Sequence, residues 1–400
     1  MDDFVNLLNY GIAFFSLFVV NFFLLVFLIH RKDCVKETKK TKWRPFVSIV
    51  VPAYNEGKYI HECLESIVSV DYPRDKLDVI IVDDGSSDST YEIVKKFIRS
   101  NNYSSFMQVV TKKNAGKGAA LNFGIAKAKG ELVATMDADS YLTKNTILEL
   151  LPLLSDPEVM AVTPAVKVRE SNAWLKELQR VEYLMILFSR KLLSFIDSVP
   201  VTPGPFSLFR ASVFEKVGLF DEHNLVEDQE IALRIQKNNF KIKSSITADV
   251  YTEPPDHMSD LLKQRIRWQR GGLRNYWNYR GLISPKYGDF GIYFVPLNFA
   301  SITAFFLVLG LLIYSIVATP TYVKYIWVDS LGLSIGLFTF VSVFVVITSI
   351  IFLWVAITSF KNEKVKLRYL FSFMVFYWYL MVGYNVLTLV KELRREKDSW

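Results

Sequence analysis

A chain of 400 residues that is 51% hydrophobic and 22% charged, with a mean hydropathy of +0.22, is too apolar for an ordinary soluble protein. Two cysteines and four histidines argue against a disulfide scaffold and against a zinc or other His-based metal cluster. The formal net charge of +7 would suit nucleic acid. However, the basic residues gather beside apolar segments, so we expect no nucleic-acid partner.

The first predicted element is a transmembrane helix within residues 1–30. From Phe4 to Ile29 the chain carries no charged residue, which is enough to cross ~30 Å of hydrocarbon as a helix. The segment lacks the basic start and the cleavage site of a signal peptide. A basic linker over residues 31–44 follows. By the positive-inside rule this flank is cytoplasmic and the N-terminus faces outward.

Residues 45–256 are predicted to form a cytoplasmic α/β domain. Short apolar runs that fit strands alternate with segments of helical periodicity. This alternation predicts a mostly parallel, doubly wound sheet. We expect strands at 46–51, 79–82, 108–111, 132–136 and 159–162, and helices near 60–70, 90–98, 118–128 and 145–153.

The fourth expected strand runs directly into Asp137-Ala138-Asp139. A buried strand that ends this way brings both carboxylates to the carboxyl edge of a sheet, where open α/β folds bind ligands. Alternation along the strand places Asp137 and Asp139 on the same side. Such oxygen ligands suit Mg²⁺ or Mn²⁺ carrying a diphosphate. A plain capping turn is the alternative, and the other strand ends must decide between them.

Polar residues also follow the other expected strands. Tyr54 could stack on a base, and Asp83 or Asp84 could accept a hydrogen bond from a base N–H. Lys117 could neutralise phosphate, and Gly116 would let the backbone approach a ligand at a helix start. Each motif alone also fits a turn. Turns do not explain why all of them follow successive strands.

The segments 51–56, 83–88, 114–117 and 137–139 together resemble the nucleotide-sugar half of family 2 glycosyltransferases, which have a GT-A fold. The resemblance implies an α/β GT-A domain fused to transmembrane and interfacial helices. It also implies a divalent cation, Mg²⁺ or Mn²⁺, on Asp139 with Asp137 nearby. The nucleotide-sugar ligands that it implies here are Tyr54, Glu56, Asp83, Asp84, Lys117 and Asp137.

A long helical pattern over residues 172–196 interleaves apolar and basic residues. Such a helix can lie in a membrane interface or pack its apolar stripe on the sheet, and both readings stay open. The Gly/Pro loop that follows, 202–210, leads into a short strand. It resembles the acceptor-side loop of the same enzymes, which makes Gly204 a candidate acceptor contact.

Val226-Glu227-Asp228 opens the next predicted helix. Carboxylates in a first turn may serve only as caps. Glycosyl transfer, however, needs a base for the acceptor hydroxyl, and a carboxylate is suitable. The family motif is Thr-Glu-Asp with the Asp as base, which implies Asp228 as base beside Glu227. Val226 replaces the family's threonine, so any acceptor contact made by that hydroxyl is missing.

Residues 257–288 are predicted as interfacial helices. Gln264, Arg267 and Trp268 share one helical face. A guanidinium suits a diphosphate, and an indole offers an apolar plane to a sugar. The Gln-x-x-Arg-Trp pattern resembles that of processive synthases of poly-N-acetylglucosamine, hyaluronan, cellulose and chitin, and of some glycolipid-forming relatives. The resemblance implies that Gln264 and Arg267 bind the nucleotide sugar and that Trp268 binds the acceptor.

Three more uncharged segments, 292–318, 331–357 and 369–390, are predicted membrane helices within residues 289–392. Three crossings would place the basic tail, 393–400, outside, which the positive-inside rule disfavours. One segment could instead be re-entrant or interfacial. The topology of the C-terminus therefore stays open.

The resulting hypothesis is an inverting glycosyltransferase of the cell membrane, multi-pass, with membrane lipids around it. It would use a UDP-sugar donor, of the N-acetylglucosamine or glucose type, to extend an extracellular polysaccharide that it also translocates. In size and layout the chain is most similar to bacterial poly-β-1,6-N-acetylglucosamine synthases. The alternatives are a single addition to a lipid acceptor, and a transporter or receptor with a nucleotide-binding domain. Whether an accessory membrane subunit takes part stays open.

Overall fold

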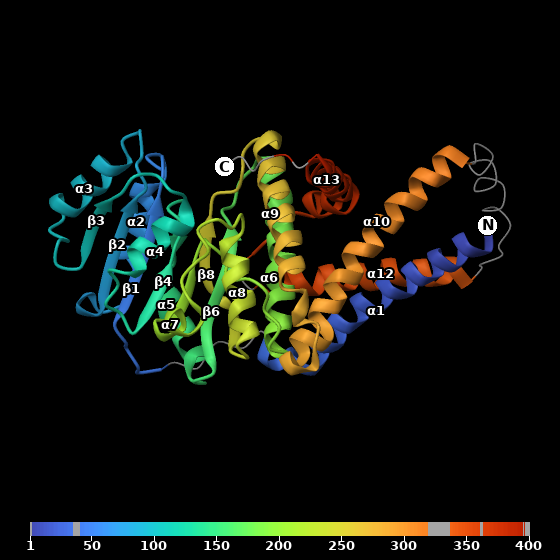
Figure 1. Ribbon diagram of the computed structural model, residues 1–400, viewed down its shortest axis with the longest axis horizontal. Coiled ribbons are helices and arrows are strands. Elements are labelled where there is room, and N and C mark those ends of the chain that lie inside the picture. Colours follow the sequence, from blue (N-terminus) through green and yellow to red (C-terminus); the bar gives the residue numbers. More distant parts are fainter. Residues whose placement is uncertain (1, 35–40, 319–336, 361–362, 395, 397–400) are drawn as a thin grey trace.

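The computed structural model describes residues 2–34, 41–318, 337–360, 363–394 and 396. A sheet with its covering helices occupies one end of the molecule, and long apolar helices extend from the other (Figure 1). Residues 331–336 of the predicted segment 331–357, and residues 395 and 397–400 of the basic tail, lie outside the described residues.

Within the described residues, eight strands form one sheet in the order β3-β2-β1-β4-β7-β6-β8-β5. β1 pairs in parallel with β2 and β4, and β2 pairs in parallel with β3. β7 lies antiparallel between β4 and β6, β8 is parallel to β6, and β5 is antiparallel to β8. The prediction of a mostly parallel sheet is confirmed. The strands are β1 (Val47–Ala53), β2 (Leu77–Asp83), β3 (Met107–Thr111), β4 (Leu132–Thr135), β5 (Ser140–Leu142), β6 (Val159–Val168), β7 (Ser207–Arg210) and β8 (Lys241–Thr252).

Helices cover both faces of the sheet because alternate strand residues point to opposite sides. Ile49 and Val51 share a buried cluster with α2 and α3, whereas Val50 shares another with α4. The helices of this part are α2 (Ile60–Val68), α3 (Thr90–Ser100), α4 (Lys117–Ile125), α5 (Thr146–Leu150), α6 (Trp174–Phe195), α7 (Ser212–Val217), α8 (Glu227–Lys237) and α9 (Met258–Asn278).

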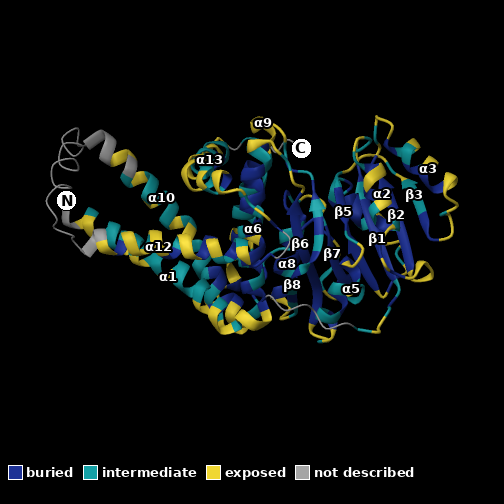
Figure 2. Cartoon of the chain, turned by 180° about the vertical axis from the view of Figure 1, so that it is seen from behind, coloured by how far each residue is buried: buried dark blue, intermediate teal, exposed yellow. Residues whose placement is uncertain are grey.

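The apolar helices are α1 (Asp2–Cys34), α10 (Val295–Ala318), α12 (Leu337–Thr358) and α13 (Leu367–Leu393). All four are long and apolar enough to cross a membrane. α1 and α12 lie side by side, and α10 runs outward with them, whereas α13 is seen end-on beside α9 (Figure 1). The burial colours show mainly intermediate and exposed residues along the described parts of all four (Figure 2).

α6 connects the two ends of the molecule. Its Leu187 and Phe188 belong to one buried cluster that includes Val166 of β6, Val26 of α1 and Phe352 of α12. The helix therefore packs on the sheet with one side and on the apolar helices with the other. Packing of this segment on the sheet is thus observed, whereas its position in a membrane interface stays a prediction.

Candidate active site

Charged side chains from three elements converge on Lys117, the first residue of α4. Its Nζ lies 2.6 Å from Asp137 Oδ1, just beyond β4, and 3.2 Å from Glu227 Oε1, at the start of α8. The two carboxylates and the charge of Asp228 raise the pKa of Lys117 well above its usual range, against the opposing effect of burial. The lysine therefore stays protonated and joins the two halves of the site.

The loop before β7 passes through this cluster at Gly204. A Cβ at this position would lie 2.6 Å from both Asp137 Oδ2 and Lys117 Nζ. The Gly204 C=O accepts from the Asp137 N–H at 3.1 Å, and its N–H donates to Asp228 Oδ2 at 3.3 Å. A side chain at this position would displace the Asp137 carboxylate or the Lys117 ammonium group. The loop links Asp137, expected on the donor side, to Asp228, expected to be the base.

Burial is the main cause of the raised pKa of Asp228. Burial and then the charge of Glu227 raise the pKa of Asp228 to about 6, while Lys117 and Arg267 oppose the rise. The Asp228 C=O accepts from the N–H and the hydroxyl of Thr202, at 3.1 and 2.8 Å. A carboxylate held in this way, with a pKa close to neutral, is well suited to accept a proton.

Carboxylates crowd together where a divalent cation is expected. Burial and then Asp137 raise the pKa of Asp139 to about 7, and burial followed by Asp139 and Asp137 raises that of Glu56 to about 7. A divalent cation would offset this repulsion, and hard oxygen donors suit Mg²⁺ or Mn²⁺. Among the described residues no cluster of three His, Cys, Asp or Glu could hold a metal. Asp137 and Asp139 are the carboxylates that could hold such a cation.

The side of the site expected to bind the nucleotide is formed by loops that Asp83 and Asp84 hold in place. Asp83 accepts from the Ser86 N–H at 3.2 Å and the Thr111 hydroxyl at 3.0 Å. Asp84 accepts from the Gly116 N–H at 2.9 Å and pairs with Lys112 at 2.6 Å. Both carboxylates are buried, so each organises a loop whatever else it binds. The Tyr54 side chain, 50% exposed, is open for stacking.

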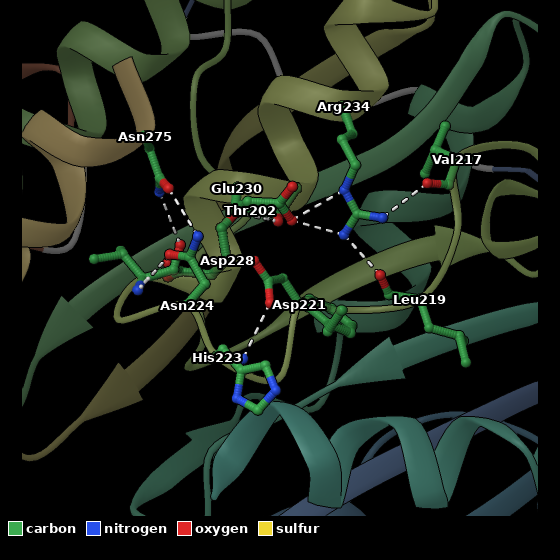
Figure 3. Close-up of polar contacts among 12 residues, drawn as sticks. Thr202, Val217, Leu219, Asp221, His223, Asn224, Asp228, Glu230, Arg234 and Asn275 are labelled. Atoms are coloured by element: carbon green, nitrogen blue, oxygen red, sulfur yellow. Dashed lines mark hydrogen bonds and ion pairs between the residues drawn. The ribbon is translucent and has the colours of Figure 1, made fainter. Parts of the chain in front are cut away.

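The turn that leads into Glu227 and Asp228 is clamped by α9 (Figure 3). Asn275 of α9 donates to the Val226 C=O at 3.3 Å and accepts from Asn224 at 2.8 Å, and Asn224 accepts from the Val226 N–H at 3.0 Å. A Cβ at position 271 would overlap the Val226 side chain. Val226 thus packs against α9 at Gly271, where the helix has no side chain. This contact accounts for an apolar residue where the family carries threonine.

A second set of contacts ties the loop before this turn to α8 itself (Figure 3). Arg234 pairs with Glu230 at 2.7 Å and donates to the C=O groups of Val217 and Leu219 at 2.8 and 2.6 Å. The His223 N–H donates to Asp221 at 3.0 Å. These bonds fix the loop over residues 217–226, and hence the start of α8.

The three residues of the α9 motif make different contacts. Arg267 donates to the Leu225 C=O at 2.8 Å, and its charge acts on Asp228, which places it at the site. Gln264 accepts from Arg265 at 2.5 Å, and the Trp268 ring lies under the Arg265 guanidinium at 4.3 Å. Gln264 and Trp268 therefore meet at Arg265, a residue that the sequence motif does not include.

Sequence reasoning missed Arg190 of α6. Its side chain is buried, its charge interacts with that of Asp228, and burial lowers its pKa to about 10. Its Nε and Nη1 find no hydrogen-bond partner within the part of the chain that the structure describes. The sequence did contain a signal: Arg190 is three residues from both Leu187 and Leu193, so this charged residue lies on the apolar stripe of the helix.

Comparison with known proteins identifies the relatives of this chain. Residues 48–218 match the family described as Glycosyl transferase family 2. The poly-beta-1,6-N-acetyl-D-glucosamine synthase of Staphylococcus epidermidis is 28% identical over 369 residues, which cover 88% of this chain and 85% of that protein. The probable glycosyltransferase YdaM of Bacillus subtilis is 32% identical over 242 residues, covering 58% and 57%.

The fold is also found in a solved structure. The mannosyltransferase PcManGT of Pyrobaculum calidifontis, in complex with GDP-Man and Mn²⁺, superposes with a TM-score of 0.63 at 22% identity. The similarity covers 87% of this chain and 99% of that one. The expected GT-A fold is thereby confirmed.

Proposed function

Given that the chain belongs to glycosyl transferase family 2 and is a glycosyltransferase, we propose that it transfers a sugar from a UDP-sugar to a growing polysaccharide. Membership of this family removes the transporter or receptor alternative. The observation that supports the proposal most directly is the bridge of Lys117 and Gly204, which places the donor-side Asp137 beside Glu227 and Asp228. The named synthase of S. epidermidis supports a UDP-N-acetylglucosamine type of donor.

On the donor side, Tyr54 stacks on the base, and the loops organised by Asp83 and Asp84 surround the nucleoside. Asp137 and Asp139 would hold Mg²⁺ or Mn²⁺, which would neutralise charge on the diphosphate. Lys117 and Arg267 add positive charge beside the same group. Charges fixed in a partly dry site stabilise a leaving diphosphate without reorganisation.

On the acceptor side, Asp228 takes the proton from the acceptor hydroxyl. The hydroxyl oxygen forms a bond to the anomeric carbon on the face opposite the diphosphate. The bond between that carbon and the diphosphate oxygen breaks, and UDP leaves with the electron pair, so the configuration inverts. Gly204 fixes the distance between the two sides because its N–H and C=O bond to Asp228 and Asp137.

The catalytic domain, residues 45–256, is proposed to face the cytoplasm of a multi-pass membrane protein. The basic linker after α1 supports this orientation, and the apolar length of α1, α10 and α12 supports the spans. Product that leaves between these helices would reach the outer side, as polymer export requires.

A second candidate is a single transfer to a membrane lipid. Arg190 favours it, because a buried guanidinium with free N–H groups beside the base suits an anionic acceptor such as a lipid phosphate. Replacing Arg190 by Met would then raise the KM for the acceptor about tenfold or more, the worth of a charged hydrogen bond. A neutral polymer acceptor would leave that KM within about threefold.

The test of the proposed function uses purified protein in lipid nanodiscs with Mg²⁺ or Mn²⁺. UDP-N-acetylglucosamine, UDP-glucose, UDP-glucuronate and UDP-galactose are supplied separately, and labelled products are sized beside Asp228→Asn. A high-mass, glycosidase-sensitive product that is absent from the variant supports the proposal and identifies the sugar. A one-sugar lipid supports the second candidate. UDP release without product, or full activity of Asp228→Asn, contradicts the mechanism.

A further inference from the structure

Both ends of α13 are anchored to the catalytic part of the molecule. Just before its first turn, Glu363 pairs with Arg180 of α6 at 2.5 Å and with Lys167 of β6 at 3.5 Å. At its last turn, Glu392 pairs with Arg270 and Arg274 of α9, at 2.5 and 3.0 Å. Both side chains of the Glu363–Arg180 pair are buried.

The middle of α13 is bonded to the same two helices. The Tyr377 hydroxyl hydrogen-bonds the carboxylate of Glu182 on α6. Tyr384 bonds to Tyr377 and to Gln269 of α9. Glu182 in turn pairs with Arg265 of α9 at 2.6 Å. The helix therefore lies across α6 and α9 along its length.

This placement conflicts with a membrane crossing. The 27 residues of α13 extend about 40 Å as a helix, more than the ~30 Å of a hydrocarbon core. A crossing helix would carry one of its ends to the far side, away from the catalytic part. Instead, α13 is seen end-on in both views while α1, α10 and α12 run across the page (Figures 1 and 2).

The two faces of α13 differ in chemistry. The side of α13 toward the catalytic part carries groups that can hydrogen-bond: Tyr369, Tyr384 and Thr388 are buried, and Tyr377 and Glu392 are half-buried. The exposed face carries large apolar side chains: Leu367, Phe371, Met374, Val375, Phe376, Trp378, Tyr379, Leu387, Leu389 and Leu393.

Basic residues flank both ends of the helix. Lys364, Lys366 and Arg368 precede or open it, and Lys391 and Arg394 close it. A spanning helix has one cytoplasmic end, and basic residues concentrate there. Basic residues at both ends fit a helix whose two ends meet the same anionic leaflet.

From these contacts we propose that α13 does not span the membrane but lies along its cytoplasmic leaflet. Its apolar face enters the lipid, as in other interfacial helices, and its hydroxyl face rests on α6 and α9. The chain then has three spans, α1, α10 and α12, and a cytoplasmic C-terminus. The inference rests on the proposed cytoplasmic position of the catalytic domain. It resolves the conflict between the basic tail and the charge rule.

The first test is topological labelling of the full-length protein with a membrane-impermeant maleimide. Lys364→Cys and Arg394→Cys probe the two flanks of α13, Phe4→Cys the outer end of α1, and Lys96→Cys the catalytic domain; all four positions are exposed. The native Cys34 and Cys63 are buried, and the unsubstituted protein gives the background. We expect both flanks to react in inverted vesicles and neither in intact cells. Reaction of Arg394→Cys in intact cells would overturn the proposal.

The labelling separates this inference from the orientation on which it rests. Reaction of Lys96→Cys in intact cells would contradict the cytoplasmic position of the catalytic domain. With Lys96→Cys protected in intact cells, the two α13 flanks alone decide whether the helix crosses.

A second measurement asks what covers the exposed face. Spin labels at Phe371→Cys and Leu389→Cys lie on the same side of the helix, about 27 Å apart along its axis, and both positions are exposed. Their depth in nanodisc lipid is measured by collision with oxygen and a water-soluble relaxant. An in-plane helix places both labels at one shallow depth. Clearly different depths would mean a crossing, and labels that oxygen in lipid does not reach would mean another partner. Either result overturns the proposal.

Discussion

The side of the site expected to bind the nucleotide lies at the ends of strands, whereas the side expected to bind the acceptor lies at the start of α8. The two sides are held in place in different ways. Asp83 and Asp84 are bonded by loops of neighbouring strands, so the loops expected to surround the nucleoside are held together within β1 to β4. Asp228 instead depends on Thr202, Arg267 and the clamp of Asn275 on its turn, which come from distant parts of the chain. The nucleotide side can thus form locally, whereas the acceptor side requires the packed helices.

The largest effect should come from removing the base. Asp228→Asn keeps the shape of the side chain but cannot accept the proton, so we expect kcat to fall about a thousandfold. Donor binding should stay within about threefold, because the nucleotide side does not depend on this residue. Product formation and UDP-sugar affinity would be measured separately. The exposed Asp71→Asn is the matched control, and a loss of less than tenfold in Asp228→Asn would argue against its role as base.

The next effect tests the link between the two halves. Gly204→Ala places a methyl group against Asp137 and Lys117. We expect about a hundredfold loss of kcat because the acceptor side shifts relative to the donor. The melting temperature should change little, since the loop can move. Gly281→Ala, at a glycine with open space around it, should keep full activity. Equal loss in both variants would remove the special role of Gly204.

The pH dependence sharpens the same comparison. Since Asp228 must be deprotonated to act, and its pKa is about 6, kcat/KM should fall tenfold per pH unit below about pH 6 and level off above it. The positive charge of Arg267 holds this pKa down, so Arg267→Gln should move the acid limb to higher pH. An unmoved limb in that variant would mean that another group controls it.

The smallest effect is expected at Val226. Its side chain packs against Gly271, so restoring the family's threonine should change kcat/KM by less than about threefold. The same substitution buries a hydroxyl, at a cost of about 1 kcal/mol. Activity and thermal unfolding of Val226→Thr would be compared with Val213→Thr, in the buried cluster under α7. A large gain in activity would mean that the hydroxyl does reach the acceptor.

Local patterns predicted that Asp84, Lys117 and Asp137 lie along one edge of the sheet, because parallel strands bring their ends to a common edge. The carboxylates after β4 and the lysine that opens α4 could be placed together without knowing any long-range contact. By contrast, β8 was not predicted. Its sequence starts with Lys241 and contains Ser244 and Ser245, and it becomes a strand because β6 and β5 flank it in the sheet.

The acceptor half and α13 were harder to predict for a related reason. Nothing in the local sequence indicates that Lys117 pairs with Glu227, or that Arg190 faces Asp228. Hydropathy also treats a tyrosine-rich helix as a span, because it does not register that Tyr377 and Tyr384 bond to α6 and α9. Apart from that between Arg190 and Asp228, these interactions join residues more than one hundred positions apart.

α9 carries two sets of contacts on different faces. Arg267, Gly271 and Asn275, four residues apart, meet the turn before Asp228, while Arg270 and Arg274 meet α13. One helix therefore contacts both the turn before Asp228 and the helix proposed to rest in lipid. A change in the lateral pressure or headgroup charge of the bilayer would shift α13, and α9 would transmit that shift to the turn before Asp228. Turnover in detergent micelles and in bilayers of differing composition should accordingly differ even at saturating substrate.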